Sequence, residues 1–125
     1  MSFEWSDYLD LAQELARQGA IHSSREAELR SAISRAYYAA FCKSRNHLRD
    51  KEHEILSTGS EAHSQVQDKF VLSKDRRRKQ IGENLNRLRT LRNRADYKDQ
   101  FFKLYETTLV SLGRAEETIS DLKRL

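Results

Sequence analysis

The chain has 125 residues, a formal net charge of +4, 34% charged residues and 38% hydrophobic residues. Its length fits one domain over residues 1–125, and the lack of proline with only four glycines argues against a β-protein, whose turns need such residues. The sequence shows neither the roughly 20-residue apolar run of a membrane span nor a secretory signal segment, so we expect a cytoplasmic protein without a membrane anchor.

Apolar spacing predicts two helices in the first half of the chain. The first is expected over residues 4–18, with Gly19 as its stop. A cap at Ser23 or Ser24 opens the second helix, which continues to about Lys51. The stretch AISRAYYAAF inside the second helix is apolar around much of its circumference, so this helix should lie centrally and contact several neighbours.

Three further helices are predicted in the second half. A loop around Gly59 precedes a short helix over 61–71, Ser73 or Asp75 caps a fourth helix, and a fifth runs from about Asp99 to the end of the chain. The stripe of the fourth helix is spaced by four, three, four and three residues: Ile81, Leu85, Leu88, Arg92 and Ala95.

This alternation is the pattern of helices that pack nearly parallel, at about 20° to one another. The fifth helix repeats it over three heptads. Short connections make neighbouring helices antiparallel. We therefore predict an all-α, up-and-down bundle of four to five antiparallel helices.

Arg92 stands in the stripe where an apolar residue is expected. Burying a guanidinium without a partner costs several kcal/mol, so Arg92 needs a carboxylate, a set of carbonyls or an external anion. One interpretation is an arginine at the rim of the core, paired with Asp96 four residues later, with Leu91 turned inward. The other is an anion-facing arginine in a groove. Arg35 is a second candidate of this kind, surrounded by small residues of the second helix.

Positive charge is concentrated in residues 74–94, which hold nine Lys or Arg and two acidic residues, whereas the rest of the chain sums to −3. Such a segment fits a polyanion-binding surface, because each neutralised phosphate releases counterions; it also fits an ordinary solvated helix face. The candidate anion-binding residues are Arg35, Arg76, Arg77, Arg78, Arg92 and Arg94.

The four histidines do not form a metal site, because no two of them share one helix face at a spacing of four. His63 lies beside the stripe of the third helix and is expected to be a core or capping histidine. Cys42, the one cysteine, lies on an apolar face and is expected in the core. We predict no metal and no cofactor.

Two stretches, SAISRAYYAAF and LRNRADY, carry a resemblance to a known family. Together with HSQV of 63–66 and the following Phe70, they resemble the HEPN superfamily, in particular a prokaryotic subgroup of short stand-alone proteins. The resemblance spans roughly residues 25–100. It implies a four- or five-helix bundle that often forms a homodimer, with the motif arginine lining a cleft at the dimer seam.

Many HEPN proteins are metal-independent ribonucleases, and others pair with a small nucleotidyltransferase in toxin–antitoxin or defence operons. The ribonuclease signature is an arginine, often followed by asparagine, and then a histidine that is separated from the arginine by a gap of four to six residues. Arg92 and Asn93 match its opening, but Tyr97, Lys98 and Asp99 occupy the positions of the histidine, and no histidine follows His63. Acid–base cleavage of RNA thereby lacks its usual agent.

The sequence thus leads to three hypotheses about function. The first is a HEPN-type binding module for RNA, a nucleotide or a partner protein such as a nucleotidyltransferase, without the standard nuclease chemistry. The second is a ribonuclease toxin with an altered site made of Arg92, Asp96, Tyr97 and a spatially adjacent His63. The third is a purely structural interaction or dimerisation protein.

Overall fold

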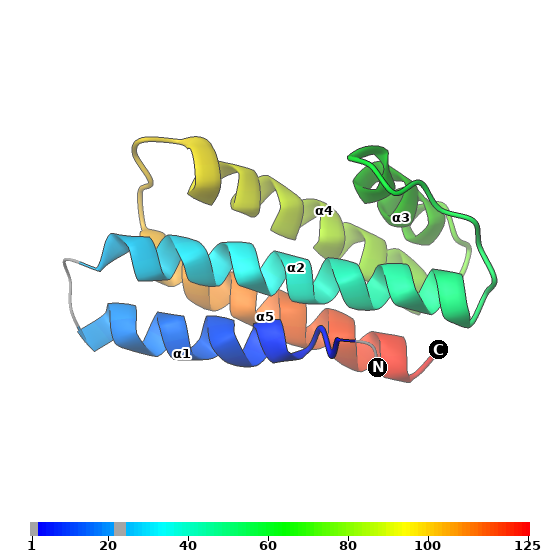
Figure 1. The fold of residues 1–125 in the computed structure, drawn as a ribbon, viewed down its shortest axis with the longest axis horizontal. Helices are drawn as coiled ribbons and strands as arrows, with labels where there is room; N and C mark the ends of the chain where they lie inside the picture. The colour runs from blue at the N-terminus through cyan, green and yellow to red at the C-terminus, as the bar shows by residue number, and fades with distance from the viewer. Residues whose placement is uncertain (1–2, 22–24) are drawn as a thin grey trace.

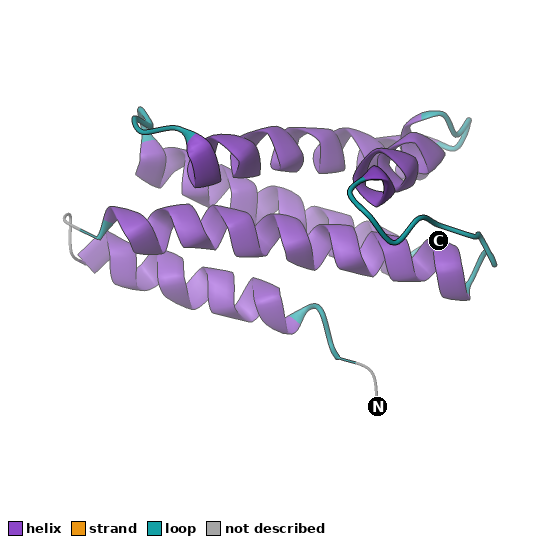
Figure 2. Cartoon of the chain, turned by 45° about the horizontal axis from the view of Figure 1, so that its top comes forward, coloured by secondary structure: helices purple, strands orange, loops and turns teal. Residues whose placement is uncertain are grey.

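The computed structural model describes residues 3–21 and 25–125, and every regular element within them is a helix (Figure 1). Four long helices run up and down beside one another, whereas α3 is inclined steeply to them and appears nearly end-on in Figure 2. The predicted all-α bundle is confirmed. The helices are α1 (Asp7–Ile21), α2 (Glu26–Asp50), α3 (Glu61–Val71), α4 (Arg76–Tyr97) and α5 (Leu104–Lys123).

Helix α2 is the centre of the bundle. It packs against α1, α4 and α5, which explains why its sequence is apolar around most of its circumference. Four alanines of α2 are fully buried and allow these neighbours to approach closely: Ala32, Ala36, Ala39 and Ala40. The central position predicted for this helix is confirmed.

The ends of α1 differ from the prediction. The Glu4 carboxylate accepts hydrogen bonds from the backbone N and the hydroxyl of Ser6, which holds this segment in a turn, so the helix begins only at Asp7. Gly19 lies inside the helix, and a Cβ at this position would come within 2.6 Å of the Leu29 side chain. Gly19 thus permits close packing and does not stop the helix. The caps predicted at residues 23 and 24 lie outside the described residues.

The start of α5 also differs from the prediction, because the segment after α4 is held in a non-helical conformation. The last residue before α5, Lys103, has a φ of 55°, in the left-handed region. The Arg30 side chain donates to three backbone carbonyls at this end of α4, those of Ala95 (3.0 Å), Lys98 (2.5 Å) and Asp99 (3.1 Å). These bonds satisfy acceptors that the helix end leaves free.

Helix α3 matches its predicted range, and α4 begins at the predicted cap, where the Asp75 carboxylate accepts a hydrogen bond from the backbone N of Arg78 at 2.9 Å. The two helices touch where a Cβ at Gly82 would lie 2.5 Å from the backbone N of Val71. This close crossing fixes α3, and with it His63, against the bundle. Across the described residues, no helix is both long and apolar enough to cross a membrane.

Candidate functional site

Arg92 is the core of the candidate site. The side chain comes from the inner face of α4, where only 9% of the residue is exposed, so the heptad pattern placed Arg92 in the seam correctly. The guanidinium carbon lies 5.2 Å from the ring centroid of Tyr37 and 5.4 Å from that of Tyr38, both on α2. Such distances are typical of cation–π contacts. Nε of Arg92 is buried and has no hydrogen-bond partner among the described residues.

Asp96, the predicted ion partner, is present but distant. Its Oδ2 lies 3.8 Å from Nη1 of Arg92, beyond hydrogen-bonding distance. The same oxygen accepts a long hydrogen bond, at 3.4 Å, from the hydroxyl of Ser34. The carboxylate therefore offsets part of the charge of Arg92 without satisfying its N–H donors.

His63 joins the same cluster from the first turn of α3. Its Nδ1 lies 2.5 Å from the hydroxyl of Tyr37, and its ring stacks on that of Phe41 at 4.3 Å between centroids. Burial raises the pKa of Tyr37, so the hydroxyl keeps its proton and donates a hydrogen bond to Nδ1. Burial, and then the charges of Arg89 and Arg92, lower the pKa of His63. The imidazole is therefore neutral near pH 7 and lies within electrostatic reach of both arginines.

A hollow of about 650 Å³ opens beside this cluster, between the start of α1, α2 and the segment leading into α3. We call it the aromatic hollow. Arg35 lies in it with its guanidinium carbon 4.9 Å from the Tyr8 ring and 5.2 Å from the Tyr38 ring. The ring of Tyr38 therefore contacts both Arg35 and Arg92. The other side chains that line the hollow include Trp5, Phe41, Cys42, Arg45, Arg49, Leu56 and His63.

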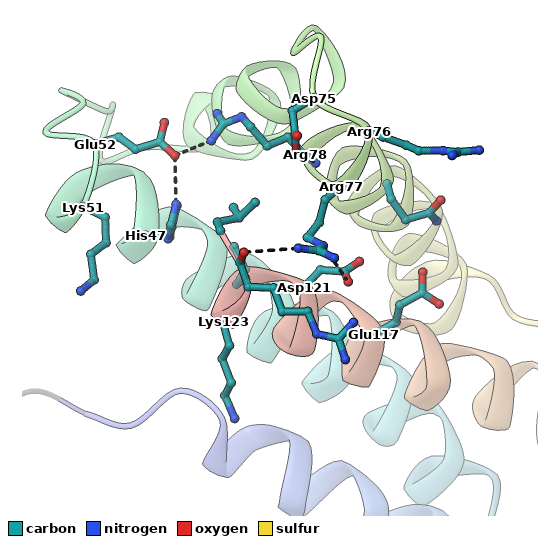
Figure 3. A pocket seen from close by; sticks show the side chains of 14 residues that line it. His47, Lys51, Glu52, Asp75, Arg76, Arg77, Arg78, Glu117, Asp121 and Lys123 are labelled. Atoms are coloured by element: carbon teal, nitrogen blue, oxygen red, sulfur yellow. Dashed lines mark hydrogen bonds and ion pairs between the residues drawn. The ribbon is translucent and has the colours of Figure 1, made fainter.

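The arginines at the start of α4 form a separate group, which we call the arginine-rich end (Figure 3). Arg78 pairs with Glu52, and Nε of Arg77 lies 3.9 Å from Asp121, whereas Arg76 points away from this network. A cavity of about 1310 Å³ lies between them, with Lys51 and Lys123 also lining it.

Glu52 is the central carboxylate of the arginine-rich end. It accepts hydrogen bonds from Arg78 and from Nε2 of His47, the latter at 2.9 Å. Burial alone would raise the pKa of Glu52, but these hydrogen bonds hold it below its usual value. Arg78 and His47 thus share one carboxylate at this end of the bundle.

The structure brings some of the predicted site residues together and separates others. Arg92, Asp96 and His63 share one cluster, and Arg35 adjoins it through Tyr38. The three arginines at the start of α4 lie about 20–24 Å away along the helix, at 1.5 Å per residue.

Arg94 and Tyr97 point away from the cluster. The guanidinium carbon of Arg94 lies 4.3 Å from the ring centroid of Phe101, and Tyr97 is 74% exposed.

Several residues contribute to the site without a clear signal in the sequence. Tyr37 and Tyr38 provide the ring faces that hold two arginines. Arg89 was counted only as part of the charged segment, although it lies three residues before Arg92 on the same helical face. The three-residue spacing of Arg89 and Arg92 was the sequence feature that could have assigned Arg89 to the site. Trp5 and Tyr8 come from another helix region, and no local pattern could have placed them.

The described residues contain no group of three or more histidine, cysteine, aspartate or glutamate side chains suited to hold a metal ion. No protein-family model, no curated protein and no solved structure matches this chain.

Proposed function

We propose that this protein is an RNA-binding module of the HEPN type that holds a phosphate group at Arg92. The observation that carries this proposal is a guanidinium that is 9% exposed, rests on two tyrosine rings and keeps a buried Nε without a partner. A buried, incompletely satisfied arginine is costly to the fold. A bound phosphate would offset this cost, because its oxygens match the fork of guanidinium donors and supply the missing negative charge.

The surroundings of Arg92 favour an anion. Arg89 and Arg35 add two positive charges that are only partly buried, and Asp96 is the sole carboxylate within 4 Å of the Arg92 donors among the described residues. The neutral His63 adds no negative charge. Such a site binds one phosphate of a chain and leaves the neighbouring phosphates to the surrounding basic side chains.

His63 favours a second candidate function, a metal-independent ribonuclease. A neutral imidazole in the same cluster as Arg92 is suited to accept a proton from a ribose hydroxyl. Binding remains the leading proposal because Nδ1 is already engaged with Tyr37 and the ring is stacked on Phe41, as in a histidine that serves packing.

The HEPN resemblance extends the proposal to the oligomeric state, the partner and the biological system of this protein. The module would act as a homodimer in the cytoplasm of a prokaryote, with RNA or a small nucleotidyltransferase as partner in a toxin–antitoxin or defence system. The competing hypothesis is a purely structural dimerisation protein, for which Arg92 would matter to stability alone.

Binding of a labelled single-stranded RNA, followed by fluorescence anisotropy over a series of salt concentrations, tests the leading proposal. Arg92→Ala should weaken binding about 10- to 100-fold, the value of one strong charged contact, and should reduce the slope of log K against log salt by about one. Arg92→Lys should fall between Arg92→Ala and the unchanged protein, because lysine keeps the charge and loses the fork.

Arg87→Ala is the matched control, since Arg87 is an exposed arginine of the same helix that lies against α5 and outside the cluster. Equal effects of Arg87→Ala and Arg92→Ala would overturn the proposal. Urea unfolding of each variant separates a binding loss from a folding loss. RNA cleavage in EDTA that His63→Gln abolishes would establish the ribonuclease instead.

A further inference from the structure

The aromatic hollow differs in composition from a general anion site. Its ring-bearing residues are Trp5, Tyr8, Tyr38, Phe41 and His63, and its charged residues are three arginines. No carboxylate lines it within the described residues. By contrast, four acidic residues line the cavity at the arginine-rich end: Glu52, Asp75, Glu117 and Asp121.

The arginines of the hollow lie against ring faces. Arg35 contacts the rings of Tyr8 and Tyr38, and the guanidinium carbon of Arg45 lies 5.3 Å from the ring centroid of Trp5. Unpaired bases stack on aromatic side chains and on the planes of arginine guanidinium groups. The walls of the hollow therefore offer two kinds of stacking surface, together with positive charge for the sugar–phosphate backbone.

The size and position of the hollow fit one nucleotide. Its volume of about 650 Å³ lies in the range of small-molecule sites. Tyr38 contacts Arg92 as well as Arg35, so the hollow and the phosphate site share a wall. A base in the hollow and its phosphate near Arg92 would thus belong to one segment of chain. Ser57 and Thr58 also line the hollow and carry hydroxyl groups of the kind that hydrogen-bond to the polar edge of a base.

We propose that the aromatic hollow is a subsite for one unpaired base of the RNA that Arg92 holds. This inference rests on the proposed function, and it deepens it: the ligand is single-stranded, because a base within a duplex cannot enter the hollow. A protein ligand is less suited, since acidic side chains would meet the arginines but leave the rings without stacking partners.

The hollow can be observed directly, because Trp5 is the only tryptophan of the chain and lines it. Titration with adenosine monophosphate should quench its fluorescence in a saturable way. Ribose 5-phosphate, which has the sugar and phosphate but lacks the base, should bind about tenfold more weakly or not at all, given the usual contribution of one stacked base. Equal binding of the two compounds would overturn the base subsite.

Two variants extend the test to RNA. Tyr8→Leu removes a ring, and Arg35→Gln removes a guanidinium without changing any ring. Each should weaken binding of a single-stranded RNA by about tenfold. Tyr105→Leu is the matched control, since Tyr105 is an exposed tyrosine of α5 outside the hollow. If Tyr8→Leu also lowers the free energy of unfolding in urea, the RNA affinity of Arg35→Gln decides whether the hollow binds a base.

The outcomes separate this inference from the proposed function. If Arg92→Ala abolishes RNA binding while Tyr8→Leu and Arg35→Gln match the control, RNA binding stands and the base subsite is wrong. If adenosine monophosphate quenches Trp5 but Arg92→Ala leaves RNA binding unchanged, the hollow takes a base and the proposed role of Arg92 is wrong. Binding of a matching duplex as tightly as the single strand would contradict the subsite as well.

Discussion

The two arginine groups of α4 differ in how the fold treats their charge. At the start of the helix, Arg78 is closely paired with Glu52 of the segment after α2, and the exposed Arg77 lies 3.9 Å from Asp121 of α5. Near its end, Arg92 lies on tyrosine rings, with its one carboxylate at 3.8 Å and Nε unpartnered. Both groups consist of arginines on one helix, so their surroundings account for the difference.

This difference teaches that the density of positive charge along the sequence does not locate a site. The run of three arginines is the most conspicuous basic stretch of the chain, yet Arg78 is paired with Glu52, and Arg77 lies 3.9 Å from Asp121 and donates a hydrogen bond to the backbone carbonyl of Arg124. Unmatched charge that the fold has to hold is better evidence of an external anion. We therefore expect the end of α4 to dominate binding and its start to serve mainly stability.

The largest effect on the free energy of unfolding is expected at the crossing of α3 and α4, which supports both arginine groups of α4. Gly82→Ala places a Cβ 2.5 Å from the backbone N of Val71, an atom that cannot move without shifting α3. The strain should cost about 3 kcal/mol, less about 1 kcal/mol gained from the better helix propensity of alanine. Urea unfolding should show a net loss of about 2 kcal/mol.

Gly113→Ala is the matched control, because nothing lies within 4 Å of a Cβ at that position of α5. Helix propensity alone then acts, and the free energy of unfolding should rise by up to about 1 kcal/mol. A gain in stability for both variants would mean that α3 is not fixed at this crossing, and the placement of His63 beside Arg92 would lose its support.

A smaller effect is expected at the arginine-rich end. Glu52→Gln removes the carboxylate shared by Arg78 and His47 and should lower the free energy of unfolding by about 1–2 kcal/mol at pH 7, between the values of exposed and buried pairs. Asp50→Asn, which breaks an exposed pair between neighbours in the sequence, should leave the free energy of unfolding nearly unchanged.

The Glu52→Gln variant also tests whether the start or the end of α4 is the main RNA-binding surface. It releases Arg78 from its carboxylate, so a masked RNA site at this end would become available. We expect RNA affinity to rise by no more than about twofold, since only one charge is released and it is partly screened by salt. A tenfold rise would show that the arginine-rich end is the main binding surface.

The helical frame could be predicted from the sequence because its signals are local or periodic. The four–three spacing placed Arg92 in the seam, and the acidic cap Asp75 marked the start of α4. The ends of α1 and the start of α5 could not be predicted, since they depend on contacts between distant segments. Gly19 packs on Leu29, and Arg30 holds the carbonyls that follow α4.

The candidate site was predictable only in part, for the same reason. The pair of Arg92 and Asp96 follows from helical spacing, whereas the contact between His63 and Tyr37 joins residues 26 apart on different helices. Trp5 reaches the hollow from the segment before α1. A single sequence carries no signal for such encounters.

The smallest effect concerns the titration of His63. Because its pKa is lowered in the folded protein, the unfolded chain takes up a proton first as the pH falls below the ordinary histidine value of about 6.5. The contribution of the neutral imidazole is therefore present above that pH and is lost as the pH falls through the folded pKa. His63→Gln should make the decline in the free energy of unfolding over this interval shallower, as measured by urea unfolding at several pH values.

The cause of this shift connects His63 to the arginines of the α4 end. Burial is the first cause, and the charges of Arg89 and Arg92 follow. Arg89→Ala should therefore raise the pKa of His63 toward its ordinary value without fully restoring it, as followed by NMR of the imidazole protons. Arg87→Ala, the loss of an equal charge on another face of the same helix, should leave it unchanged. Equal shifts in the two variants would mean that His63 senses only the net charge of the protein, and His63 would then have to be removed from the cluster around Arg92.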